Sequence, residues 1–265
     1  MPSDFCWRAF YNLYRTNLNL YVMKNCAYLI MLFLLVACGG EQGMEITTSE
    51  IDAYVADKMS ESQEYDVSQS LRFSRENETY EVVRYMQNDT VILYLETDVT
   101  KDKQVNRQIF FKDGLPVYVD EYIASNTTEN PFKQRKIYLD GVRVIESFEK
   151  STDIEYDLEG MDFEKSKVAI SEFDFARPDS ALLQKGDFEM KFEEFIIIDP
   201  QTYLILENAE SKYDVALFVS DAHDLLNQIS ANPANYKGKT LFVTHQFVLM
   251  NNIERMLFID GKLTE

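Results

Sequence analysis

The chain has 265 residues, of which 45 are acidic and 26 are basic, giving a formal net charge of −19 at pH 7. Such a charge repels phosphate backbones and anionic lipid surfaces, which argues against nucleic-acid binding. The chain has two histidines and neither a Gly-x-Ser-x-Gly nor a His-Glu-x-x-His motif. We therefore predict a non-enzymatic protein.

A short apolar segment near the N-terminus has the features of a secretory signal. Residues 23–25 read Met-Lys-Asn, and an almost unbroken apolar run follows over residues 26–37. A basic start, a short apolar core and a small residue before the cleavage point are the parts of such a signal. The run is too short to span a bilayer, which takes about 20 apolar residues.

Residues 35–38, Leu-Val-Ala-Cys, resemble the lipobox of bacterial lipoproteins. The resemblance implies a diacylglycerol thioether on the sulfur of Cys38, cleavage before this residue, and acylation of its new amine. It also implies a cell-envelope protein whose lipid binds the membrane. Gly39 replaces the aspartate that marks inner-membrane retention in that family, which favours the outer membrane and a periplasmic or surface-facing body. An ordinary buried helix end is the alternative interpretation.

The lipobox divides the first part of the chain. Residues 1–22 are interpreted as an over-extended gene start or a long n-region, residues 23–37 as the signal peptide, and residues 38–48 as a tether. Cleavage would leave Cys38 as the only cysteine, with its sulfur lipidated. We therefore expect no disulfide, although the compartment would permit one.

Residues 49–177 are predicted to form a helix followed by an antiparallel β-meander. Apolar residues recur at helical spacing over residues 49–61, behind Thr48 or Ser49 as the N-cap. From about residue 65 to 147 the apolar pattern has period two, which is typical of strands. Six or seven strands are expected in this stretch.

Three short polar turns separate pairs of these predicted strands. They fall at residues 87–90, 112–114 and 140–141, and the last two contain Asp-Gly, a strong signal for a type I′ hairpin. The phrase at residues 107–114 is echoed at residues 135–141 and again at residues 255–261. We interpret the three copies as the same type of hairpin, formed three times along the chain.

Residues 184–265 are predicted to form a second, smaller domain. The expected order is three strands, a helix over residues 221–229, and two strands that form a hairpin across Asn251 and Asn252, and this order loosely resembles the OB-fold. That resemblance implies binding of oligonucleotides or sugars on the second and third strands. The segment has thirteen acidic and seven basic residues, so no basic groove is expected, and a small barrel without a ligand is an equal alternative. The predicted fold class is thus mainly β (α+β).

An acidic run between the two domains is the one candidate for metal binding. The acidic side chains in question are Asp153, Glu155, Asp157 and Glu159. Calcium prefers several carboxylate and carbonyl oxygens, but Ser166 occupies the position where an EF-hand loop has its bidentate glutamate. Alternation with apolar residues favours a strand with a solvated acidic face. We predict no metal and no cofactor.

Aromatic side chains supply the candidate ligand site. In the predicted register Phe110 and Tyr138 share one face of the meander, and Tyr118 and Tyr94 join them if the register allows. A sheet that is apolar on both faces is either covered twice or presents a groove for a sugar, a lipid or a peptide. Burial under the helix or the second domain is the simpler alternative. His223 and His245 are expected to be structural.

These features predict a lipid-anchored envelope protein that binds a small ligand or an envelope partner. Two alternatives remain. A structural or assembly subunit would expose a broad apolar patch or a sheet edge. An extracytoplasmic hydrolase using carboxylates and a metal would have a deep pocket with converging acidic residues.

Overall fold

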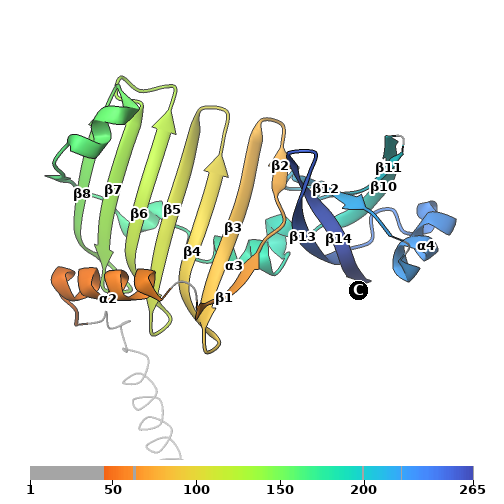
Figure 1. Cartoon of the computed structure of the whole chain (residues 1–265), viewed down its shortest axis with the longest axis horizontal. Coiled ribbons are helices and arrows are strands. Elements are labelled where there is room, and N and C mark those ends of the chain that lie inside the picture. The colour runs from red at the N-terminus through yellow and green to blue at the C-terminus, as the bar shows by residue number, and fades with distance from the viewer. Residues whose placement is uncertain (1–44, 62–63, 199, 222, 265) are drawn as a thin grey trace, which may run out of the picture. The chain divides into compact units, whose positions relative to one another are not determined.

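The computed structural model describes residues 45–61, 64–198, 200–221 and 223–264, all within one compact unit (Figure 1). The signal peptide, Cys38 and most of the tether lie outside these residues. The described chain is mainly β, as predicted. None of its described helices has the length and apolar character needed to cross a bilayer.

Nine strands form the first part of the molecule, which is the meander. They are β1 (Asp66–Gln69), β2 (Phe73–Arg75), β3 (Glu78–Gln87), β4 (Thr90–Val99), β5 (Lys103–Lys112), β6 (Leu115–Ser125), β7 (Phe132–Leu139), β8 (Val144–Thr152) and β9 (Glu164–Lys165). Five strands form the second part, which we call the OB-like barrel. They are β10 (Lys191–Ile198), β11 (Gln201–Glu207), β12 (Asp214–Val219), β13 (Leu241–Met250) and β14 (Ile253–Leu263). The helices are α2 (Thr48–Ser60), η2 (Glu155–Gly160), η3 (Ile170–Glu172), α3 (Arg177–Leu182), η4 (Gly186–Phe188), α4 (Asp224–Ala231) and η5 (Pro233–Asn235).

Helix α2 begins one residue earlier than the sequence pattern suggests. Its N-cap is Thr47, whose side-chain oxygen accepts from the backbone N–H of Glu50, while the Glu50 carboxylate accepts from the backbone N–H of Thr47 at 2.8 Å. This capping box satisfies two N–H groups at once. The predicted caps, Thr48 and Ser49, are therefore wrong, since both residues lie inside the helix.

The meander runs antiparallel from β3 to β9, each strand paired with the next. Two of the predicted tight turns have the positive φ angles of type I′ at both central positions, namely Asn88–Asp89 and Asp113–Gly114. The turn at Asp140 differs, since only Gly141 has a positive φ. The Asp140 carboxylate there accepts from the backbone N–H groups that follow it, which closes a wider loop.

The third copy of the echoed phrase is not a hairpin. Gly261 lies inside β14 opposite Val243 in β13, and the turn between these strands is at Asn251 and Asn252. A Cβ atom at position 261 would lie 3.2 Å from the backbone oxygen of Phe242. Glycine is therefore present here because β13 and β14 pack closely, so the echoed phrase does not mark a turn at its third copy, whereas the predicted hairpin across Asn251 and Asn252 is confirmed.

The acidic run is also not a strand. Residues 155–160 form the 3₁₀-helix η2, in which Leu158 is buried while Tyr156 is 85% exposed. The alternating apolar pattern thus belongs to a short helix that buries Leu158, and the predicted strand is wrong.

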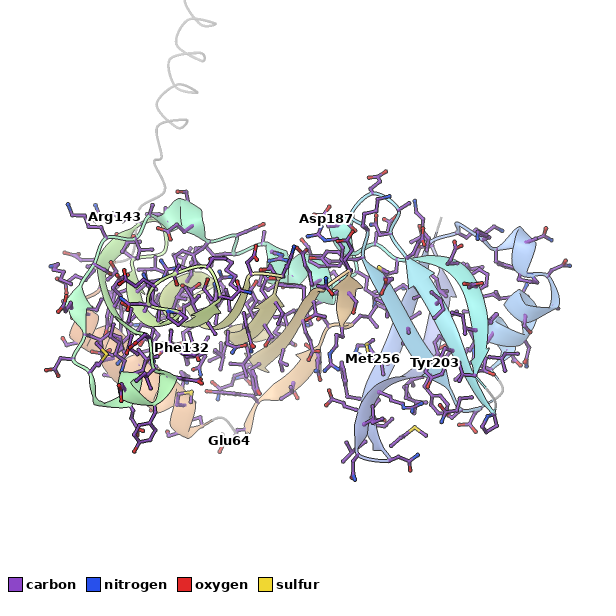
Figure 2. The ribbon with its side chains drawn as sticks, turned by 90° about the horizontal axis from the view of Figure 1, so that it is seen from above. Glu64, Phe132, Arg143, Asp187, Tyr203 and Met256 are labelled. Carbon is purple, nitrogen blue, oxygen red and sulfur yellow. The ribbon has the colours of Figure 1, made fainter. Side chains whose placement is uncertain are left out.

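Apolar side chains cover both faces of the meander, and each face has its own cover. Helix α2 lies against one face, where Ile51 is fully buried beside Phe110 and Tyr118. The other face packs against the segment from η3 to η4 and against the barrel, in one continuous core that includes Phe188 and Leu217. Figure 2 shows the two parts seen from above, with Phe132 in the meander and Tyr203 and Met256 in the barrel.

The OB-like barrel has the predicted order of three strands, a helix and two strands. Strands β10, β11 and β12 pair antiparallel, as do β13 and β14. Phe218 of β12 pairs parallel with Leu257 of β14, and a bridge from Lys191 to Thr240 closes the ring. Strand β12 also pairs with β2, so the barrel and the meander share one continuous sheet.

A row of opposite charges crosses the face of the meander opposite α2. Register places Glu96, Arg107, Glu121 and Arg135 side by side on four neighbouring strands. Glu121 is fully buried and accepts from Arg107 Nε at 2.6 Å and from Arg135 Nε at 2.7 Å. Burial disfavours the charge on Arg107, but the two flanking carboxylates outweigh it and raise the pKa of its guanidinium.

We expect Glu121→Ala to destabilise the protein by ~3–5 kcal/mol, because the change removes the shared carboxylate of two largely buried guanidinium groups. The free energy of unfolding in urea measures the loss. Glu146→Ala is the matched control, since its partner Lys165 is 69% exposed and such pairs contribute at most ~1 kcal/mol. Equal losses for the two variants would contradict the central role of this row.

His245 links the barrel to the meander. Its Nε2 lies 3.1 Å from the backbone oxygen of Ser70, which can only accept, so Nε2 carries the hydrogen. Burial lowers the pKa of His245 below 6.5, and the hydrogen bond to Ser70 opposes this only in part.

The free energy of unfolding should therefore fall as the pH is lowered below about 6.5. The unfolded chain takes up a proton on His245 near pH 6.5, at a higher pH than the folded chain does, so the free energy of unfolding is greatest above that value and decreases below it. Urea unfolding at pH 7.5 and pH 5.5 measures the decrease, and His245→Gln, which keeps a donor, should make it smaller. An unchanged decrease in the variant would rule out His245 as its source.

Candidate ligand-binding pocket

Three of the four predicted aromatic candidates lie together, but they are covered. Register pairs Phe110 with Tyr118 and Tyr118 with Tyr138, and the ring centroids are 6.1 and 5.2 Å apart. Helix α2 packs over them, and the Tyr138 hydroxyl donates to Asp52 of that helix at 2.9 Å. All three rings are therefore part of the core under α2.

The fourth candidate, Tyr94, does not join them. It pairs with Ile109, which places it on the opposite face of the sheet, and its hydroxyl donates to Asp179 of α3 at 2.5 Å. Burial raises the pKa of Tyr94, as it does for Tyr118 and Tyr138, so these hydroxyls stay protonated and act as donors. The register therefore contradicts the expectation that Tyr94 shares a face with Phe110 and Tyr138.

The acidic candidates do not converge on one point. Asp153 precedes η2, while Glu155, Asp157 and Glu159 lie on that helix. Glu155 accepts a hydrogen bond from the hydroxyl of Tyr122. No group of three or more potential metal ligands occurs in the described part of the chain.

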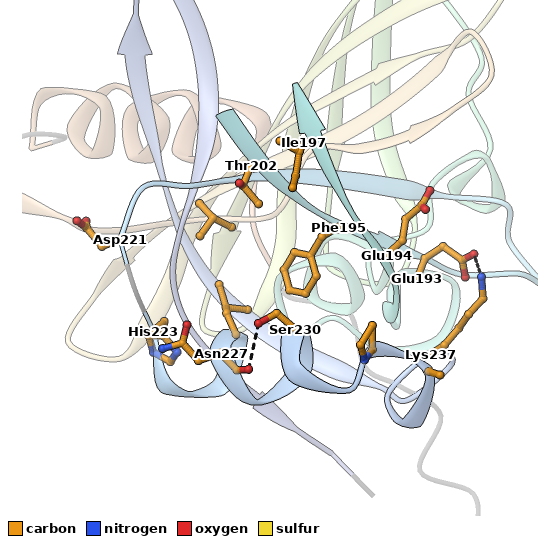
Figure 3. A pocket seen from close by; sticks show the side chains of 14 residues that line it. Glu193, Glu194, Phe195, Ile197, Thr202, Asp221, His223, Asn227, Ser230 and Lys237 are labelled. Atoms are coloured by element: carbon orange, nitrogen blue, oxygen red, sulfur yellow. Dashed lines mark hydrogen bonds and ion pairs between the residues drawn. The ribbon is translucent and has the colours of Figure 1, made fainter. Parts of the chain in front are cut away.

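The OB-like barrel contains a pocket that none of these predictions included. It has a volume of about 510 Å³ and lies between the β10–β11 hairpin on one side and helix α4 on the other (Figure 3). Phe195 and Thr202 come from the hairpin, and Asn227 and Ser230 come from the helix. The end of β12 and the passage into α4 close a third side.

One wall of the pocket is apolar and extends to the surface. Phe195 and Val219 line it from the strands, and Leu226 lines it from α4, where it is buried in the core. Ile197 also lines the pocket, although its side chain is 73% exposed. Ligand pockets are lined mainly by apolar side chains, and this wall provides such a lining.

His223 lines the pocket, and one of its ring nitrogens has no hydrogen-bond partner in the described residues. Its Nε2 lies 3.0 Å from Asp260 Oδ1, and its ring packs edge-on against Phe258 with the centroids 5.2 Å apart. Its Nδ1 is buried and has no hydrogen-bond partner in the described residues. Because Nε2 faces a carboxylate and carries the hydrogen, Nδ1 is an acceptor in the neutral ring. A buried acceptor without a donor is costly, and this atom has almost no accessible surface, so it is closed off from the pocket.

The opposite end of the pocket is polar and held by an ion pair. Lys237, which follows η5, pairs with Glu193 of β10. Glu194 also lines this end, while Asp221 lines the pocket on the side of His223, and both are exposed (Figure 3). The excess of carboxylates favours a neutral or cationic ligand over an anionic one.

Sequence reasoning noticed His223 but assigned it a structural role, and it placed Phe195 and Ile197 only in a strand. The lining extends from residue 193 to residue 237, so no local spacing marks it. The acidic pair at residues 193–194 inside an otherwise apolar strand was the one local signal, and it coincides with a register shift between Phe192 and Glu194. Comparison with protein-family models, curated proteins and solved structures found no significant match.

Proposed function

We propose that this protein is a lipid-anchored binding protein of the cell envelope that holds a small ligand in the pocket of its OB-like barrel. The observation that carries the proposal is the pocket itself, whose volume of about 510 Å³ lies within the usual range for small-molecule sites. Its apolar wall and few polar groups are the combination that such sites use for affinity and orientation. We assign it a binding role and no catalytic one.

The lining suggests the chemistry of the ligand. Phe195 and Ile197 would contact an apolar body, and the exposed side chain of Asn227, which also lines the pocket, would offer it a hydrogen bond. The carboxylates of Glu194 and Asp221 would favour a neutral or positively charged molecule. A small amphipathic compound with a donor group fits these requirements.

The anchor in this proposal is the acylated Cys38. It rests on the resemblance of residues 35–38 to the lipobox, and Cys38 itself lies outside the described residues. Helix α2 begins at Thr48, so about ten residues would separate the lipid from the folded body. The outer membrane, with the body facing the periplasm or the cell surface, is the proposed location.

Filling the pocket should weaken binding without unfolding the protein. Ser230 is exposed and points into the pocket from α4, so Ser230→Trp should reduce binding by about tenfold or more, ~1.4 kcal/mol, by occupying the space of the ligand. The probe is N-phenyl-1-naphthylamine, which has an apolar body and one N–H donor, and its fluorescence under direct excitation reports binding.

Gln228→Trp is the matched control, since Gln228 is exposed on the same helix but does not line the pocket. It should bind the probe as the native chain does. Equal probe binding by the native chain and by Ser230→Trp would contradict a site at this pocket.

The anchor has its own test in the intact mass of the native protein extracted from membranes. The expected mass is that of residues 38–265 plus acyl chains, because cleavage and acylation both occur at Cys38. Cys38→Ala should lose the acyl mass and the membrane association. A chain that still begins at Met23 or Met1 without modification would overturn the lipoprotein part of the proposal.

A further inference from the structure

A second concavity lies in the meander, far along the chain from the barrel pocket. It has a volume of about 510 Å³ and is bounded by strands β5 to β8 and by the loop that joins β6 to β7. Its charged lining consists of Lys103, Lys133 and Arg135, and no acidic side chain lines it in the described part of the chain. This composition is the reverse of what a net charge of −19 would lead one to expect.

Strand register brings these side chains together on one face. Lys103 of β5 pairs with Ser125 of β6, and Lys133 of β7 pairs with Ser151 of β8. Ile123 lies between them as the partner of Lys133. Because alternate residues of a strand share a face, this row points to the same side as Arg135.

The three cations differ in how far they are already neutralised. Arg135 donates from Nε to buried Glu121 at 2.7 Å and from Nη1 to Glu172 at 3.0 Å, so its main role is to hold the floor of the concavity. Lys133 lies 3.5 Å from both carboxylate oxygens of Glu149, which is a weak, partly exposed pair. Lys103 is exposed and has no ion pair within the described ranges.

The rim of the concavity is ordered by the β6–β7 loop. Ser125 and Thr127 share a hydrogen bond of 3.0 Å between their hydroxyls, and the backbone N–H of Asn126 donates to the backbone oxygen of Asp102 at 3.0 Å. These contacts fix the loop over the ends of β5 and β6 before any ligand arrives. Hydroxyls of Thr127, Thr128 and Ser151 remain at the lining as additional donors or acceptors.

We propose that this concavity is a binding site for a small sugar that carries an oxyanion, either a phosphate or a carboxylate. Two ammonium groups would face the oxyanion, which is the arrangement that lysines provide for phosphates as point charges. The neighbouring hydroxyls would bond to the sugar hydroxyls, and Ile123 and Pro131 would contact the ring. The site is separate from the barrel pocket and does not depend on the function proposed for it.

Calorimetry of the full-length protein in detergent tests this site with glucose 6-phosphate, glucuronate and uncharged glucose. Glucose 6-phosphate or glucuronate should bind, and glucose should bind at least about tenfold more weakly because it lacks the oxyanion. A preference for one charged sugar identifies phosphate or carboxylate as the group recognised, and both results support the site. Equal binding of glucose would overturn the proposal, as would binding of neither charged sugar.

Three substitutions locate the binding. Lys103→Gln and Lys133→Gln should each weaken it by about fivefold, the size expected for one partly exposed charge pair, while Glu149→Gln should strengthen it because Lys133 is released. Lys101→Gln is the matched control, since it removes the same charge two residues from Lys103 without lining the concavity. All four residues are at least a third exposed or lie in a turn, so thermal unfolding should change little.

The outcomes separate this site from the proposed function. An equal effect of Lys101→Gln and Lys103→Gln would mean a general charge effect and would overturn the site. Binding of N-phenyl-1-naphthylamine in the barrel should be the same in all these variants. Loss of probe binding in Ser230→Trp with unchanged sugar binding would confirm that the two sites are independent.

Discussion

The fold depends on one constraint, which is that the meander is apolar on both faces and must be covered twice. A sheet of this kind exposes too much apolar surface to be stable alone, since each buried side chain of the size of Leu or Phe contributes ~1.5–3 kcal/mol. Helix α2 covers one face, with Ile51 at its centre. The segment from η3 to η4 and the barrel cover the other, where Phe188 stacks on Tyr80 with the centroids 5.1 Å apart. The covering elements therefore bury the aromatic side chains that an open sheet would offer to a ligand.

The row of opposite charges adds specificity to this apolar arrangement. Apolar contacts tolerate a shift of strands, but a shift of one residue between β5 and β6 would move Arg107 and Glu121 to opposite faces. Arg135 belongs both to this row and to the lining of the second concavity, so the same interaction that fixes the register also sets the floor of a candidate anion site. The barrel pocket has a different origin, since it forms where the β10–β11 hairpin and α4 meet and leave space between them. The two sites thus follow from two different parts of the architecture.

Sequence reasoning succeeded where the information is local. The hairpin turns at residues 88–89 and 113–114 were predicted because their geometry depends on two residues that accept positive φ angles, and the order of elements in the barrel follows from periodicity. It failed at Gly261, which resembles a turn residue but is required by the close approach of Phe242. It also failed for η2, where one buried leucine produces an alternating pattern. The pocket could not be predicted, because its lining joins Glu193 to Lys237 through a ring closure that only the fold creates. The position of Tyr94 likewise depended on a register that composition does not specify.

The central claim is that the ligand-binding surface lies in the barrel and that the aromatic face of the meander is core. Amide chemical shifts of the folded body, followed by NMR while N-phenyl-1-naphthylamine is added, test this claim most directly. The account predicts that the shifts which change belong to the pocket, with Phe195, Thr202, Asn227 and Ser230 among them, while those around Phe110, Tyr118 and Tyr138 stay constant. Changes concentrated under α2, with the barrel unaffected, would contradict the account and would place the ligand on the meander instead.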